Sequence, residues 1–71
     1  MKARIRLETH TDVSGFVNAV ADIDKEVFLR DNKHFCVSAH SLLGAMCSIE
    51  WKEVWVECEE DIYGRIMKWV Y

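Results

Sequence analysis

The stretch KEVFLRDNKHFCVSA, residues 25–39, decides how the chain is expected to fold. Two runs with apolar residues at alternate positions, 25–30 and 34–39, are typical of β-strands, and the polar triplet 31–33 between them favours a tight turn. Three residues are too few for a crossover connection, so the two strands are expected to be antiparallel neighbours. The side chains expected to share a face within each strand are Val27 and Leu29 in the first, and Phe35, Val37 and Ala39 in the second.

The residues before this hairpin predict a strand followed by a helix. ARIRLE, residues 3–8, alternates between apolar and charged side chains, which indicates a half-buried strand. HTDVSGFVNAVADID, residues 10–24, changes to the period of a helix. Asp12 stands before the apolar run, so it is the expected N-cap of this helix. The expected buried stripe consists of Val13, Phe16, Val17 and Val20.

The residues after the hairpin predict a helix, a strand and a final helix. SLLGAM, residues 41–46, is typical of a short helix capped by Ser41 or Ser38. KEVWVEC, residues 52–58, alternates as a fourth strand, and EEDIYGRIMKWVY, residues 59–71, opens with acids as a helix N-terminus commonly does.

The element order is therefore β-α-β-β-α-β-α within one domain, residues 1–71. Four short strands and helices that can all cover one face predict an α+β open-faced sandwich. In this architecture the sheet is antiparallel, three helices pack on one face, and the other face meets water.

Net charge, the length of the apolar runs and the cysteine pattern argue against several classes of protein. A net charge of −3 argues against a nucleic-acid binder, which would normally be basic. No apolar run reaches the roughly 18 residues of a membrane span, and MKARIRLE lacks the apolar stretch of a signal peptide, so a cytoplasmic location without membrane contact is expected. Cys36, Cys47 and Cys58 are odd in number and form no C-x-x-C pair. We therefore expect reduced thiols, no metal and no cofactor.

The segment VSAHSLLGAMCSIE, residues 37–50, resembles the region of HPr phosphocarrier proteins that carries their regulatory serine. The family has a lysine and a serine there, followed by an apolar helix with glycine three positions after the serine. In this chain His40 takes the place of the lysine, and Ser41 and Gly44 match the serine and the glycine. The resemblance covers nearly the whole chain and implies the HPr-like fold, with sheet order 1-4-2-3, and a relationship to the sugar phosphotransferase system.

The chain departs from this family where the phosphate-accepting histidine is expected. That histidine lies in a G-x-H-A-R-P segment before the first helix. Here its place is held by Thr9, with His10 next to it, Thr11 in the place of the arginine and Asp12 in that of the proline. A carboxylate at this helix end would compete for the backbone N–H groups that hold a phosphate, and would repel it. The standard histidine relay is not expected, and an active phosphocarrier that uses His10 is the alternative.

Ser41 has two compatible interpretations. It is expected to cap the helix that follows, which is worth roughly 1 kcal/mol. It is also the candidate site of regulatory phosphorylation that the resemblance implies. In HPr relatives the corresponding helix region docks other proteins, so the expected partner-binding residues are His40, Leu42, Met46 and Trp51.

Two aromatic residues are out of phase with the buried positions of their strands. Phe28 and Trp55 are expected to lie near each other on the open sheet face, because strands two and four are neighbours in the implied order. Such a pair either stabilises the sheet or anchors a homodimer.

No nucleophile has an obvious base beside it, so the chain is not expected to be an enzyme with its own active site. The leading hypothesis is a regulatory or protein-interaction module whose partners are phosphotransferase-type enzymes or regulators. The two alternatives are a phosphocarrier that uses His10 and a homodimer through the face of Phe28 and Trp55.

Overall fold

The computed structural model describes residues 1–71 and contains one four-stranded antiparallel sheet. The strand order β1-β4-β2-β3 confirms the expected topology, with every neighbouring pair antiparallel. The elements in chain order are β1 (Lys2–Ile5), α1 (His10–Val20), β2 (Val27–Arg30), β3 (Cys36–Ser38), α2 (Leu42–Met46), η1 (Cys47–Glu50), β4 (Val54–Cys58), α3 (Tyr63–Ile66) and η2 (Met67–Trp69), where η denotes a 3-10 helix.

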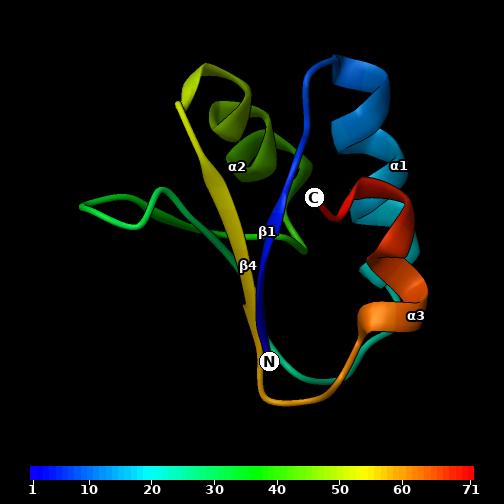
Figure 1. Ribbon diagram of the computed structural model, residues 1–71. Helices are drawn as coiled ribbons and strands as arrows, with labels where there is room; N and C mark the ends of the chain where they lie inside the picture. The colour runs from blue at the N-terminus through cyan, green and yellow to red at the C-terminus, as the bar shows by residue number, and fades with distance from the viewer.

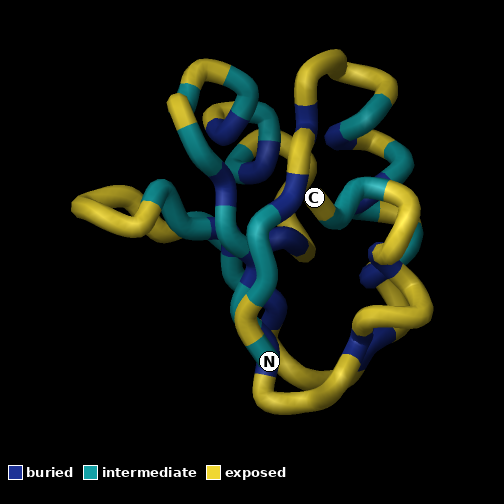
Figure 2. The backbone as a smooth tube through the Cα atoms, viewed as in Figure 1, coloured by how far each residue is buried: buried dark blue, intermediate teal, exposed yellow.

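All three α-helices pack on one side of the sheet, and the core fills the space between the two layers (Figure 1). Alternate residues of the strands and one stripe of each helix supply the buried side chains, as the sequence periods predict. Figure 2 shows the buried segments turned toward the centre of the molecule and the exposed ones on the loops and helix surfaces. The largest side chains with almost no exposed surface include Phe16, Ile5, Leu29 and Ile66. No helix in this fold is both long enough and apolar enough to cross a membrane.

The N-terminus of α1 differs from the expectation that Asp12 is its cap. Thr9 is the N-cap, and its hydroxyl oxygen accepts the backbone N–H of Asp12 at 3.0 Å. Asp12 occupies the third helical position, where its carboxylate accepts the backbone N–H groups of Glu8 and Thr9 at 3.1 and 3.2 Å. This reciprocal capping box satisfies more orphan donors than Asp12 alone, which is why the helix begins earlier, at His10.

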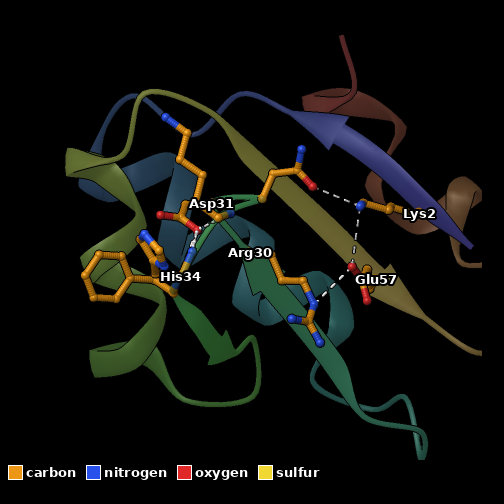
Figure 3. A network of polar contacts seen from close by, with 8 residues as sticks. Lys2, Arg30, Asp31, His34 and Glu57 are labelled. Carbon is orange, nitrogen blue, oxygen red and sulfur yellow. Dashed lines mark hydrogen bonds and ion pairs between the residues drawn. The ribbon is translucent and has the colours of Figure 1, made fainter.

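The tight turn between β2 and β3 is organised by Asp31, as the polar triplet predicts. One oxygen of its carboxylate accepts the backbone N–H groups of Lys33, His34 and Phe35 at 2.8, 2.9 and 3.0 Å (Figure 3). Asn32 adopts a φ of 69°, a left-handed conformation that asparagine tolerates better than most residues. The turn therefore extends to Phe35, and β3 is shorter than the expected strand of residues 34–39.

The C-terminal residues do not continue as the single helix expected over 59–71. α3 covers only four residues and is followed by a 3-10 turn, after which Val70 pairs with Ile5 as an isolated β-bridge. The backbone N–H of Tyr71 donates to Arg4, and Trp69 accepts from Arg6. The outer edge of β1 offers unpaired backbone groups, and these bonds to the chain end satisfy them.

Candidate functional site

α2 begins where the sequence places it, and Ser41 is its N-cap. The Ser41 hydroxyl oxygen accepts the backbone N–H of Gly44 at 3.1 Å, and the Ser41 carbonyl accepts that of Ala45 at 2.8 Å. Of the two expected caps, Ser38 instead accepts the backbone N–H of His40 through its hydroxyl. Ser41 is exposed, so its hydroxyl is accessible while it serves as a cap.

α2 is attached to the core through one narrow stripe. Ala45 is fully buried, and the buried hydroxyl of Ser48 donates to the Ala45 carbonyl oxygen at 2.7 Å. A five-residue helix that buries this stripe leaves its other side exposed. Leu42 keeps 44 % of its surface exposed and Leu43 keeps 85 %.

An aromatic stack joins the residue that ends η1 to the β2–β3 hairpin. The rings of Phe35 and Trp51 lie 6.1 Å apart between centroids, at an interplanar angle of 15°. Phe35 is 60 % exposed, contrary to the expectation that it shares a buried face with Val37 and Ala39. Its position before β3, at the end of the turn, leaves it outside the pleat that would direct it inward.

We define the α2 surface as Phe35, Leu42, Leu43, Met46 and Trp51, of which Met46 and Trp51 are half-buried against the core. Leu42, Met46 and Trp51 were expected here, whereas Leu43 and Phe35 were missed. Two adjacent leucines on a short helix cannot both face one core. This pattern in the sequence indicates that one of Leu42 and Leu43 is exposed. No sequence signal marked Phe35, because its environment depends on where the turn ends.

His40 is tied to α1 rather than turned freely toward solvent. Its Nε2 atom lies 3.1 Å from the carbonyl oxygen of Val20, the last residue of α1. This carbonyl belongs to a helix C-terminus with no basic residue in its last turn. The same carbonyl accepts the backbone N–H of Ile23 at 3.1 Å, so a ring N–H of His40 uses its second lone pair and links the start of α2 to the end of α1.

His10 is the first residue of α1 and is exposed. It lies beside the capping box, whose carboxylate from Asp12 already occupies the N–H groups of Glu8 and Thr9. Any phosphate on His10 would therefore meet a negative charge at the helix end and two backbone donors that are already engaged.

Phe28 and Trp55 share the open sheet face but are not directly opposite. Phe28 is paired with Glu57, and Trp55 lies between Arg30 and Arg4, so the two aromatic residues are diagonal neighbours. Both are half-buried. The direct cross-strand neighbours of these two aromatic residues are thus two arginines, one carboxylate and Ser38, and not each other.

Ion pairs cross this open face. The Glu57 carboxylate lies 3.0 Å from Arg30 Nε and 3.8 Å from Lys2 Nζ (Figure 3). Lys2 Nζ also lies 5.3 Å from the centroid of the Trp55 ring and donates to Asn32. A groove of about 790 Å³ beside Phe28 is lined by residues of both charge signs, among them Lys2, Lys25, Glu26, Arg30 and Glu57.

No group of three or more histidine, cysteine or acidic side chains is arranged to hold a metal ion. The three cysteines are free thiols, with Cys36 and Cys47 exposed and Cys58 buried.

Comparison of the chain with protein-family models, with curated proteins and with solved structures finds no match.

Proposed function

We propose that this chain is a protein-interaction module of HPr-like fold that acts in the cytoplasm and docks partners through the α2 surface. The observation that carries the proposal is the 85 % exposure of Leu43 beside the 44 % exposed Leu42, on a short helix whose one fully buried residue is Ala45. Exposed apolar side chains gathered in one area are typical of contact surfaces. The resemblance around Ser41 supports phosphotransferase-type enzymes or regulators as the partners.

The composition of the α2 surface suits a contact that forms and dissociates. Phe35, Trp51 and Met46 are residue types enriched at protein interfaces. The stacked rings of Phe35 and Trp51 give a flat, rigid area at little cost in side-chain entropy, because each has few rotatable bonds. A partner with a complementary apolar segment would remove this area from water.

Ser41 supplies a regulatory site within the same surface. Phosphorylation would place about two negative charges directly beside Leu42 and Leu43 and would remove the hydroxyl that caps α2. The expected effect is weaker docking of an apolar partner, because the added charge must be desolvated.

The histidine carrier is not the function we propose. The capping box of Thr9 and Asp12 favours a structural role for the residues around His10. A phosphate at that position would have to displace the Asp12 carboxylate from its backbone donors.

The proposal is tested by titrating the isotope-labelled chain with the general phosphotransferase enzyme and, separately, with an HPr-type serine kinase, monitored by NMR. Binding is expected to shift the resonances of the α2 surface. Leu43→Glu is expected to weaken binding about tenfold or more, since buried apolar anchors carry most of an interface's energy. Met67→Glu is the matched control, because Met67 is an apolar residue on η2 that is 59 % exposed.

The same samples, incubated with phosphoenolpyruvate or ATP and analysed by mass spectrometry, distinguish the two phosphorylation sites. Stable phosphate on Ser41 supports regulation of the α2 surface, whereas an acid-labile phosphate on His10 would favour the carrier. No resonance shift with either protein, or equal weakening by Leu43→Glu and Met67→Glu, would overturn the proposed docking surface.

A further inference from the structure

The two edge strands of the sheet, β1 and β3, differ in whether other residues cover their outer edge. The outer edge of β1 is occupied by the end of the chain, through the bridge from Ile5 to Val70 and the backbone bond from Tyr71 to Arg4. The outer edge of β3 has no neighbouring strand, because β3 is the last strand in the sheet and pairs only with β2. An uncovered edge of this kind is a template for pairing with another chain.

The register identifies which backbone groups of β3 point outward. The backbone bonds from Asp31 to Phe35 and from Ala39 to Val27 place odd-numbered β3 residues in hydrogen-bonded pairs with β2. Since antiparallel residues alternate, the backbone groups of Cys36 and Ser38 point away from β2. The Ser38 carbonyl accepts the Ser41 N–H at 3.2 Å and keeps one lone pair free.

β3 is only three residues long, but its edge carries no proline and no charged side chain, two features that commonly prevent edge pairing. Residues 35–39 contain no proline and no charged side chain. Cys36 is exposed, and Phe35 next to it is 60 % exposed. The edge of β1, in contrast, carries Lys2 and Arg4 in addition to its cover.

We propose that β3 pairs with β3 of a second copy of the chain, antiparallel and about a two-fold axis at Val37, to form an eight-stranded sheet. This register places Cys36 opposite Ser38 of the second copy, and the same pair recurs on the other side of the axis. The outward backbone N–H and C=O groups of Cys36 and Ser38 in both copies can then hydrogen-bond across the axis. The edge is therefore complementary to itself.

The same register is compatible with the flanking residues. Phe35 lies just before β3 and near Ala39 of the second copy, a small residue that is fully buried in its own core and leaves room for the ring. His34 lies opposite His40 of the second copy, and no carboxylate faces a carboxylate across the axis. Residues 34–40 carry no acid, so pairing brings no like-charged acids together. The proposed dimer goes beyond the α2 docking function and shares only Phe35 with the α2 surface. It uses a different part of the molecule from the open face of Phe28 and Trp55.

Light scattering coupled to size-exclusion chromatography, over a micromolar to millimolar concentration series, tests the dimer. The mass is expected to rise from that of the 8.3 kDa chain toward twice that value. Cys36→Lys is expected to keep the fold, because Cys36 is exposed, and to abolish the rise, since lysine on an edge strand opposes pairing. Cys36→Pro removes an outward N–H and is expected to give the same result.

Cross-linking tests the register. In a Cys47→Ser background, Ser38→Cys places a thiol opposite Cys36 of the second copy. Residues of a hydrogen-bonded pair have Cα atoms about 5.5 Å apart, within the range of disulfides. Mild oxidation is expected to yield an intermolecular 36–38 disulfide, identified by peptide mass. Ser14→Cys in the same background is the control, because Ser14 is exposed on α1.

A monomer mass throughout the concentration series would overturn the proposal. So would a dimer that persists in Cys36→Lys, which would place the contact elsewhere, for example on the open face. Equal intermolecular cross-linking in Ser38→Cys and Ser14→Cys would exclude the register.

Discussion

At the scale of single residues, Asp31 shows how one carboxylate organises a turn. Desolvation acts to raise the pKa of the Asp31 carboxyl, but the backbone N–H groups of Lys33, Phe35 and His34 outweigh it and hold this pKa below its ordinary value. The charged form is therefore favoured in the folded chain relative to the unfolded one. Such a group stabilises the fold above its unfolded pKa of about 3.9, and this contribution is lost as the pH falls through the folded pKa.

We predict that Asp31→Ala lowers the free energy of unfolding at neutral pH and that the difference from the wild type shrinks as the pH falls below about 4. Urea unfolding measured as a function of pH checks this expectation. Glu60→Gln is the control, since Glu60 is exposed and makes no hydrogen bond or ion pair in the fold. A constant difference between Asp31→Ala and the wild type from neutral to acidic pH would show that the carboxylate charge does not hold the turn.

The N-caps of α1 and α2 show which helix boundaries can be predicted from the sequence. Ser41 was identified as one of two possible caps of α2 because a serine before an apolar run has few other local uses. At α1 the pattern T-x-x-D is compatible with a capping box, but the position of Asp12 next to the apolar run predicts Asp12 itself as the cap. The reciprocal bonds between Thr9 and Asp12 decide the boundary, and only their joint geometry shows them.

At the scale of elements, Gly15 is explained by a neighbour that is distant in sequence. Glycine within a helix is unfavourable relative to alanine by roughly 1 kcal/mol. A Cβ atom added at Gly15 would lie 3.1 Å from Cζ2 of Trp69, whose indole also packs edge-on against Phe16 at 5.4 Å between centroids. The absent side chain lets the C-terminal segment approach α1 closely.

We predict that Gly15→Ala gives no gain in stability in the wild type but a gain of about 1 kcal/mol in a Trp69→Leu background. The reason is that leucine removes the indole atoms that the new methyl group would contact. Free energies of unfolding for the two single variants and the double variant form a double-mutant cycle that measures this coupling. Equal effects of Gly15→Ala in both backgrounds would contradict the close approach as the cause.

At the scale of the whole molecule, a chain of 71 residues depends on every layer of its small core. Ile66 has no exposed surface, although it belongs to a helix of only four residues. Its burial joins the C-terminal segment to the helical layer, and the backbone bonds of residues 69–71 then cover the edge of β1. The chain end is thus a structural part of the domain.

We predict that Ile66→Ala destabilises the fold by about 2–5 kcal/mol and Ile66→Val by about 0.5–1.5 kcal/mol. Both lose buried contacts, and the smaller change remains measurable if the alanine variant does not fold. The neighbouring Met67→Ala is expected to have little effect, because that side chain is largely exposed. Denaturant unfolding of the three variants provides the measurement, and similar losses for Ile66→Ala and Met67→Ala would contradict the packing of α3.

Local sequence patterns predict the element order and the antiparallel sheet of this chain. Alternation in residues 25–39 and 52–58, helical spacing from Val13 to Val20 and a three-residue turn are local signals, and local sterics act on them directly. The strand order 1-4-2-3 came from the resemblance and is present in the structure. Leu42, Met46 and Trp51 were placed on a candidate surface for the same reason.

Which side chains remain exposed and which edge of the sheet is free depend on long-range packing. The exposure of Leu43 depends on the single stripe through which α2 meets the core, and that of Phe35 on where the Asp31 turn ends. The end of the chain covers the edge of β1 and leaves β3 uncovered, although neither outcome is encoded within either strand. These features arise from contacts between residues far apart in sequence, which periodicity and propensity do not describe.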